Sequence, residues 1–218
     1  TLAEAQRNKL DAILRKAEIG PNDHILEVGC GWGSFAIHAV RQTGCRVTGI
    51  TVSDEQFELA TQRVREAGLS ERIEIRHCDY RHIEGTFDRI VSIEMLEAVG
   101  HAYLGAYFAA LDRALRPHGR AVIQVITLPD QRYARYRRGS DFIRKHIFPG
   151  GHLPSLGALA QAAGEHSSLT LVDLEDIGTH YATTLDLWCK RLLEARAALL
   201  SLGFDECFIR KWEYYFRY

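Results

Sequence analysis

Two hydrophobic periods alternate along most of the chain. Short apolar runs that are typical of buried strands occur at Ile25–Val28, Arg46–Ile50, Ile73–Arg76, Phe87–Ile93 and Ala121–Ile126. Apolar residues with helical spacing fill the stretches around them, over 2–17, 34–41, 53–67 and 104–115. Strands that alternate with helices favour a parallel sheet. We therefore predict an α/β fold with a doubly wound, mostly parallel, Rossmann-like sheet.

The regular alternation ends at Thr127. Residues 127–155 form a basic, aromatic insertion, and the pattern then predicts a helix near Ser155–Ala163 and a sixth strand near Leu169–Asp176. The last part, residues 180–218, is aromatic and mostly helical in pattern. We expect one domain over residues 1–218, with 127–155 as an irregular insertion and 180–218 as a helical region on the substrate side.

Composition limits the classes of protein that fit. The 218 residues are 46% hydrophobic and 25% charged with a net charge of −1, which suits a globular domain and argues against a nucleic-acid binder. The 5 cysteines form no C-x-x-C pair, so neither a disulfide framework nor a metal site is predicted. No apolar run is long enough to span a bilayer. A cytoplasmic protein is the expectation, although the chain begins without methionine.

The stretch ILEVGCGWG, residues 25–33, is the first candidate ligand site. Glycine after a strand and before a helix allows close approach of a ligand to the backbone and to free N–H groups. A dinucleotide fingerprint needs its third glycine at the sixth position, where this chain has Ser34. Glu27 is suited to an amino or hydroxyl group of a cationic ligand. These features favour S-adenosylmethionine, with a nicotinamide dehydrogenase or a plain glycine turn as alternatives.

Ligands of doubly wound sheets bind beyond the carboxyl ends of the strands. By that rule the candidate site collects the residues that follow the predicted strands, which are Gly29, Thr51, Asp79, Tyr80, Glu97, Gln124 and Tyr181. The Ser53 and Gln56 pair also has the spacing of a capping box for the helix over 53–67. An isolated histidine is more often structural, so His101 and His180 are assigned no chemistry.

Several segments together resemble the cyclopropane-fatty-acyl-phospholipid synthases and mycolic acid cyclopropane synthases. They are ILEVGCGWG, GITVSDEQ, FDRIVSIEMLEAVGH, IFPGGHLPS and HYATTLDLW. The resemblance covers nearly the whole chain and implies a class I methyltransferase fold. It also implies transfer of a methyl group from S-adenosylmethionine to a cis double bond of an acyl chain, most simply in a phospholipid and with a cyclopropane product.

The resemblance also implies roles for single residues. The methionine part of the cofactor is assigned to Glu27, Gly29, Cys30 and Gly31. The ribose is assigned to Thr51 and Gln56, and the adenine to Asp79 and Tyr80. Catalysis is assigned to Glu97 and Tyr181, which match the family glutamate and tyrosine that hold a bicarbonate ion, and to Gln124.

Gln124 departs from the family, which has a histidine at this position. A glutamine amide donates a hydrogen bond to an anion but carries no proton charge, so bicarbonate binding stays open. The alternative is a methyl-branched or methylene fatty acid. The resemblance predicts two further segments outside this sequence. One is a family segment upstream of Thr1, and the other is a last strand of the sheet after Tyr218. A non-catalytic module that binds lipid or cofactor is the alternative from another class.

Ordinary structural roles compete with these assignments. Glu97 has the character of a carboxylate in the first turn of a helix, Tyr181 of a core tyrosine and Cys30 of a small filler. Basic and aromatic residues interleave over Arg132–Lys145, which is either a solvated face or a surface for anionic lipid headgroups. The expected partners are therefore an unsaturated acyl lipid and an anionic membrane surface, without nucleic acid, and the oligomeric state is left undetermined.

Overall fold

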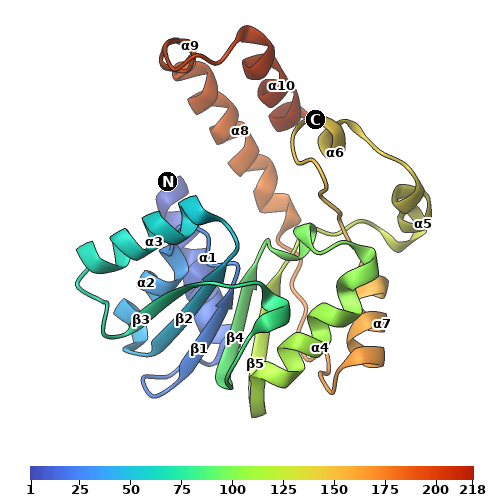
Figure 1. Ribbon diagram of the computed structural model, residues 1–218. Helices are drawn as coiled ribbons and strands as arrows, with labels where there is room; N and C mark the ends of the chain where they lie inside the picture. The colour runs from blue at the N-terminus through green and yellow to red at the C-terminus, as the bar shows by residue number, and fades with distance from the viewer.

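One sheet of five parallel strands forms the centre of the computed structural model, which describes residues 1–218 (Figure 1). The strand order is β3-β2-β1-β4-β5, and each neighbouring pair is parallel. The strands are β1 His24–Val28, β2 Arg46–Thr51, β3 Ile73–His77, β4 Phe87–Ile93 and β5 Leu115–Gln124. The predicted doubly wound α/β fold is confirmed.

Helices cover both faces of the sheet and its carboxyl edge. The α-helices are α1 Leu2–Ala17, α2 Ser34–Thr43, α3 Asp54–Glu66, α4 Leu104–Ala114, α5 Asp130–Arg138, α6 Phe142–His146, α7 Leu156–His166, α8 Gly178–Glu194, α9 Arg196–Ser201 and α10 Glu206–Arg217. The 3-10 turns are η1 Tyr80–His82, η2 Leu96–Ala98 and η3 His101–Tyr103. Helices α1, α2 and α3 lie on one face, and α4 and α7 lie on the other.

Alternation along the strands produces two separate cores. Ile25 and Val91 point into a cluster with α1 and α2, whereas Leu26 and Ile90 point into a cluster with α4 and α7. Successive strand residues face opposite sides of a sheet, so a strand covered on both faces is apolar at nearly every position. This explains the continuous apolar runs of the sequence.

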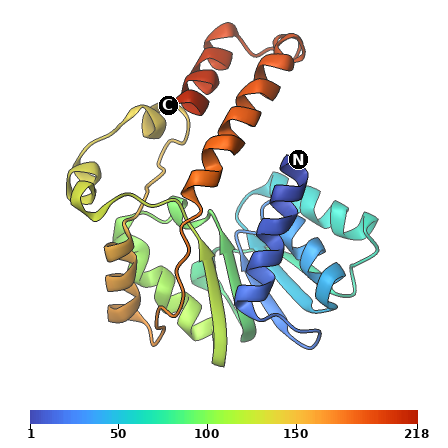
Figure 2. The same cartoon turned by 180° about the vertical axis from the view of Figure 1, so that it is seen from behind.

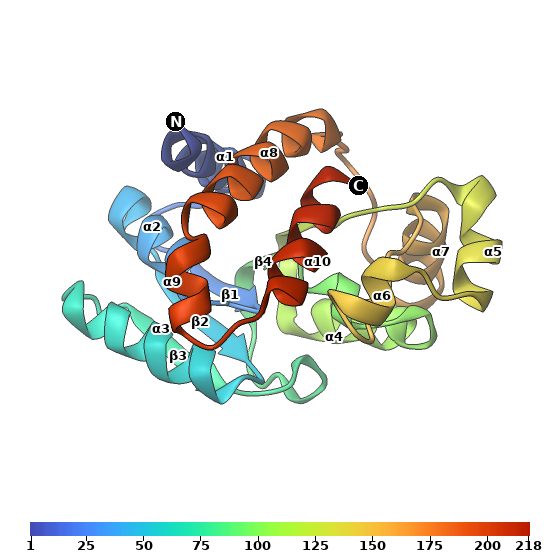
Figure 3. The same ribbon diagram turned by 90° about the horizontal axis from the view of Figure 1, so that it is seen from above.

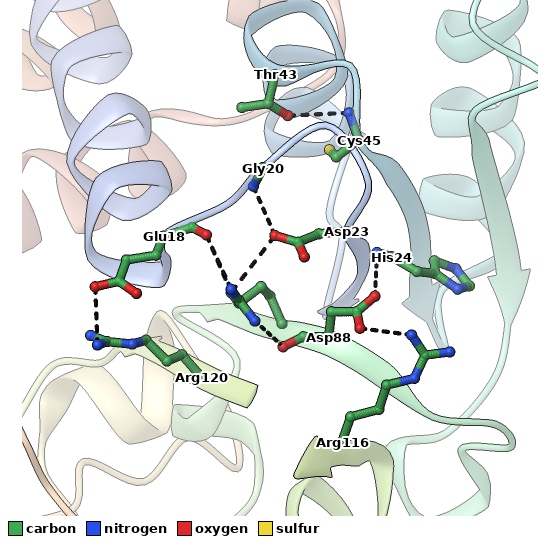
Figure 4. Close-up of polar contacts among 10 residues, drawn as sticks. Glu18, Gly20, Asp23, His24, Thr43, Cys45, Asp88, Arg116 and Arg120 are labelled. Carbon is green, nitrogen blue, oxygen red and sulfur yellow. Dashed lines mark hydrogen bonds and ion pairs between the residues drawn. The ribbon is translucent and has the colours of Figure 1, made fainter. Parts of the chain in front are cut away.

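Polar contacts close the amino edge of the sheet (Figure 4). Asp88 accepts hydrogen bonds from the backbone N–H of His24 at 2.8 Å and from Arg116 Nη1 at 2.7 Å. Arg120 pairs with Glu18 at 3.0 Å. These contacts tie β1, β4 and β5 together at the edge opposite the candidate site.

A helical hairpin stands beyond the carboxyl edge of the sheet. Figures 1 and 3 show α8 rising from this edge and α10 returning beside it. The facing sides of the two helices carry aromatic side chains, including Trp188 and Phe216, whose ring centroids are 6.0 Å apart. None of the helices combines the length and apolar character needed to cross a bilayer.

The predicted sixth strand near Leu169–Asp176 is wrong. This segment is irregular and connects α7 to α8 (Figure 2). Leu171, Val172 and Leu174 are 68%, 78% and 62% exposed. A strand needs a neighbouring strand for its backbone hydrogen bonds. The segment has none, and ion pairs from Lys16 to Asp173 and Glu175 hold it instead, at 2.5 and 2.9 Å.

Three element boundaries also differ from the pattern. The helix predicted over 104–115 ends at Ala114, and the strand predicted to begin at Ala121 begins at Leu115, so β5 contains Pro117 and Gly119. Proline is tolerated there because β5 is an edge strand with a register shift opposite Phe87–Arg89. Helix α8 begins at Gly178, so Tyr181 lies in its first turn and does not follow a strand.

The capping box predicted for α3 is only half formed. Ser53 Oγ accepts from the backbone N–H of Gln56 at 3.2 Å. The Gln56 side chain accepts from Thr51 Oγ1 at 2.8 Å, so it does not reach back to Ser53. This places Gln56 at the end of β2, where a ligand would lie.

Candidate functional site

The glycine loop after β1 has the conformation that its residues favour. Gly29, Gly31 and Gly33 have φ values of 79°, 51° and 76°. A Cβ atom on Gly29 would lie 2.7 Å from Met95 Cγ, whereas one on Gly31 would meet nothing within 4 Å. Gly29 is therefore required both by its backbone angle and by packing, and Gly31 leaves open space beside the backbone.

Glu27 is buried below this loop. Its side chain is 3% exposed in total, and its Oε2 atom has no hydrogen-bond partner. Desolvation raises the pKa of Glu27 well above its ordinary value, although the backbone N–H of Ala36 opposes that shift. A buried carboxyl with a free oxygen fits a positively charged group, such as the amino group of a methionine moiety.

Thr51, Gln56 and Cys30 surround the end of β2. The Thr51 hydroxyl donates to Gln56 Oε1 at 2.8 Å, which leaves the amide N–H groups of Gln56 available to a ribose hydroxyl. A Cβ atom on Gly49 would lie 2.8 Å from Cys30 Cβ, so Cys30 packs closely on this strand. Burial and the nearby Glu27 raise the pKa of the Cys30 thiol to about 12, so the thiol is neutral.

Asp79 and Tyr80 follow β3. Asp79 accepts from Arg81 Nε at 2.9 Å and from Arg81 Nη2 at 2.7 Å. The hydrogen bonds from Arg81 lower the pKa of Asp79 to about 2. The ring of Tyr80 lies edge-on to Tyr107, with centroids 5.5 Å apart. Both residues are held in place beside the carboxyl edge, where the adenine was predicted.

Glu97 lies in η2, beyond the end of β4. Its Oε1 atom accepts from the backbone N–H of Ile126 at 2.7 Å, and its Oε2 atom is buried without a partner. Desolvation raises the pKa of Glu97, and the charge of Glu94 adds to that effect. Glu97 therefore has one oxygen bound by the protein and one oxygen free.

Tyr181 lies in the first turn of α8 and is half-buried. Desolvation raises its pKa, and the charges of Glu94, Tyr215 and Glu97 act in the same direction. Its ring is edge-on to Trp188 at 6.0 Å. The hairpin therefore brings a neutral phenol toward the two carboxylates at the end of β4.

Gln124 does not bind Glu97. Its Nε2 atom donates to Glu94 Oε1 at 2.7 Å, and the backbone N–H of Glu94 donates to the carbonyl oxygen of Gln124 at 2.8 Å. Glu94 is absent from the predicted site, in which Glu97 represents the end of β4 by both the carboxyl-end rule and the resemblance. Its position in the sequence could have indicated it, because Glu94 directly follows the FDRIVSI strand and ligands bind beyond the carboxyl ends of such strands.

The insertion contributes a second contact that sequence reasoning missed. Tyr133 OH lies 2.9 Å from His101 Nδ1 and 2.8 Å from His152 Nε2. The backbone N–H of His152 donates to the carbonyl oxygen of Glu97 at 2.7 Å. These contacts connect α5 and the IFPGGHLPS segment to the candidate site.

A parallel sheet with a glycine loop after β1 and polar groups along its carboxyl edge is the arrangement expected of an α/β methyltransferase. The solved structure of mycolic acid cyclopropane synthase CmaA1 with SAH and CTAB supports this class. It aligns with a TM-score of 0.89 at 30% identity, over 99% of this chain and 78% of that chain.

The family is also shown by sequence. The sequence model of the family described as mycolic acid cyclopropane synthetase matches residues 1–218. The chain belongs to this family. Tuberculostearic acid methyltransferase UfaA1 of Mycobacterium tuberculosis is 46% identical over 217 residues, 100% of this chain and 51% of that protein. Cyclopropane-fatty-acyl-phospholipid synthase of Escherichia coli is 35% identical over 214 residues, 98% of this chain and 53% of that protein.

These comparisons confirm the predicted family, its methyltransferase class and S-adenosylmethionine as the cofactor of that class. The chain spans about half the length of these two curated relatives, 51% and 53%. The unpartnered Glu27 and the open space at Gly31 fit that cofactor.

Proposed function

We propose that the protein transfers a methyl group from S-adenosylmethionine to the cis double bond of an unsaturated acyl chain in a phospholipid. The names of the relatives support a lipid substrate, since they include a cyclopropane-fatty-acyl-phospholipid synthase and a tuberculostearic acid methyltransferase. The observation that carries the proposal is the pair of acidic side chains at the carboxyl edge, Glu94 held by Gln124 and Glu97 with a buried, unpartnered oxygen.

Each group has a role in this chemistry. The bound cofactor supplies an electrophilic methyl group. Glu27 and the backbone from Gly29 to Gly31 hold its methionine part, Thr51 and Gln56 its ribose, and Asp79 and Tyr80 its adenine. Positioning of an alkene, which is a weak nucleophile, in line with the methyl group removes several kcal/mol of the barrier.

Methyl addition leaves a carbocation on the acyl chain. The negative potential of Glu97 and the aromatic face of Tyr181 stabilise that cation. The cation is quenched either by ring closure or by a hydride shift followed by loss of a proton, and each route releases one proton. The product therefore depends on which carbon atom loses the proton and on which group accepts it.

We propose an open-chain product, either a methylene fatty acid or a methyl-branched fatty acid that keeps an internal double bond. The side-chain amide of Gln124 is bound to Glu94, and the negative charge of Glu94 repels a bicarbonate ion at this place. UfaA1, which carries a methyltransferase name, supports this product. The cyclopropane product is the second candidate, and the name of the Escherichia coli relative favours it.

We also propose that the protein works at an anionic membrane surface on the cytoplasmic side. Arg132, Arg135, Arg137, Arg138 and Lys145 are exposed on α5 and α6, and none forms an ion pair with an acidic side chain. Arg144 is different, because it donates to the carbonyl oxygens of Tyr136 and Gly139. The exposed group is available to lipid headgroups.

Mass spectrometry of lipids from cells that express the full-length protein tests the function. We expect a mass gain of one CH2 on monounsaturated acyl chains, and fragmentation that locates an exocyclic methylene or a methyl branch beside an internal double bond. A cyclopropane fragment pattern would establish the second candidate. Unchanged lipids, together with no binding of S-adenosylmethionine in calorimetry, would instead support a non-catalytic module.

A further inference from the structure

Glu94 has a backbone conformation that costs energy. It is the residue directly after β4, and its φ is 52°. A non-glycine residue in the left-handed region costs on the order of 1 kcal/mol or more. Two other residues share this conformation, and both have structural explanations: Glu18 caps α1, and His118 lies in the irregular part of β5.

Gln124 fixes Glu94 at two points. One hydrogen bond joins the backbones of the two residues at 2.8 Å, and another joins the Gln124 amide to Glu94 Oε1 at 2.7 Å. Glu94 Oε2 accepts no hydrogen bond from the protein, and the side chain is exposed. An oriented carboxylate with one free, accessible oxygen is suited to receive a proton from a bound molecule.

Titratable groups on three helices interact electrostatically with Glu94. Burial raises the pKa of Tyr181 on α8 and of Tyr215 on α10, and the charge of Glu94 raises both further. Burial lowers the pKa of Lys9 on α1, and Glu94 opposes that shift. The phenols of the helical hairpin and the lysine of α1 are therefore within electrostatic range of Glu94.

Glu97 is less suited to the same task. Both residues have one oxygen bound by the protein, but the free oxygen of Glu97 is buried, whereas the side chain of Glu94 is exposed. Burial raises the pKa of Glu97, and the negative charge of Glu94 contributes. The two acidic side chains therefore differ in access, because the free oxygen of Glu97 is buried whereas Glu94 is exposed and is held in one orientation by Gln124.

We propose that Glu94 is the catalytic base that takes the proton released after methyl transfer, and that Gln124 is the residue that positions it. This inference rests on the proposed function. The alkene electron pair forms the new carbon–carbon bond as the carbon–sulfur bond breaks, and the sulfonium becomes a thioether. A hydride then shifts to the cationic carbon. The C–H pair of the new methyl group forms the exocyclic double bond, and its proton passes to Glu94 Oε2 and then to water.

Two variants of the full-length protein test this role. Glu94→Gln keeps the shape of the side chain and an oxygen for the Gln124 amide, but it accepts no proton. We expect formation of the methylene product to fall at least 100-fold at saturating S-adenosylmethionine, since general-base catalysis contributes about 10²–10⁴-fold. Binding of S-adenosylhomocysteine should stay within twofold of wild type.

The variant Glu94→Gly allows a chemical-rescue experiment, and we expect it to fold. Glycine adopts the φ of 52° without strain, so this variant should be at least as stable as wild type. Added formate should restore product in Glu94→Gly at least fivefold and should have no effect on Glu94→Gln. Glu71→Gln, an exposed glutamate before β3, is the matched control and should keep wild-type activity.

The outcomes distinguish failure of the proposed role of Glu94 from failure of the proposed function. If Glu94→Gln forms the same product as wild type at a rate within threefold of the wild-type rate, Glu94 is not the catalytic base. The proposed function would remain intact. A wild-type protein that binds S-adenosylmethionine but methylates no lipid would overturn the proposed function itself, and the base with it.

Discussion

The backbone N–H of His152 donates to the carbonyl oxygen of Glu97 at 2.7 Å. This hydrogen bond joins the end of the basic insertion to the turn that carries a candidate catalytic carboxyl. The His152 side chain continues the connection through Tyr133 to His101. The insertion is therefore part of the framework of the site, although most of it lies on the surface.

Tyr133→Phe should destabilise this framework. The substitution removes the hydroxyl between His101 and His152 and leaves a ring nitrogen of the buried His152 without a partner. An unsatisfied buried polar group costs about 1–3 kcal/mol. We expect the free energy of unfolding to fall by that amount and the urea midpoint to fall in proportion. Tyr103→Phe, at a tyrosine that is 55% exposed, is the control and should change stability by less than about 0.5 kcal/mol. Equal midpoints for the two variants would contradict the framework role.

Alanine at two glycines of the loop should have unequal effects. Gly31→Ala meets only backbone strain, on the order of 1–2 kcal/mol, because nothing lies within 4 Å of its Cβ. Gly29→Ala adds a contact of 2.7 Å with Met95 and should cost about 1–3 kcal/mol more. Thermal melts without cofactor measure the difference. A larger loss in Gly31→Ala would show that packing against Met95 is unimportant.

Glu27→Gln should change how stability depends on pH. The folded-state pKa of Glu27 is raised by desolvation, so the unfolded chain releases this proton first as the pH rises above 4.5. The wild type then loses stability with rising pH, by at most about 1.4 kcal/mol per pH unit. The variant lacks this contribution and should be more stable than wild type at pH 7, while binding S-adenosylmethionine at least tenfold more weakly. Parallel stability curves for the two proteins in urea titrations from pH 5 to 8 would refute this.

Charge reversal on α5 should weaken membrane association. Arg135 and Arg138 are exposed, and each basic residue near an anionic surface contributes about 1 kcal/mol. Arg135→Glu with Arg138→Glu should lower sedimentation with anionic vesicles at least tenfold at low salt. The control pair, Arg65→Glu with Arg72→Glu, lies on the α3 side and should have a smaller effect. If the wild type binds anionic and neutral vesicles equally, the membrane proposal fails.

Hydrophobic patterns along the chain predicted the five strands of the sheet, because the burial of each strand residue depends on which face it occupies. Ile25 and Leu26 face different cores, and both are apolar because both faces of β1 are covered. The sixth strand failed for the complementary reason. Leu171, Val172 and Leu174 have the composition of a strand, but a strand forms only where a neighbour offers backbone hydrogen bonds. Pro117 within β5 was likewise tolerated only because this strand lies at an edge.

The amino-acid sequence by itself determined the order of the five strands and of the helices between them, the glycine turn after β1 and the positions of Glu27 and Glu97 relative to those elements, because periodicity and turn chemistry act over a few residues. Only the tertiary structure decided which polar groups meet. Gln124 binds Glu94, 30 residues away, and not Glu97. Hydrogen bonds act over about 3 Å, so their partners are selected by how strands and helices pack, which no local pattern specifies.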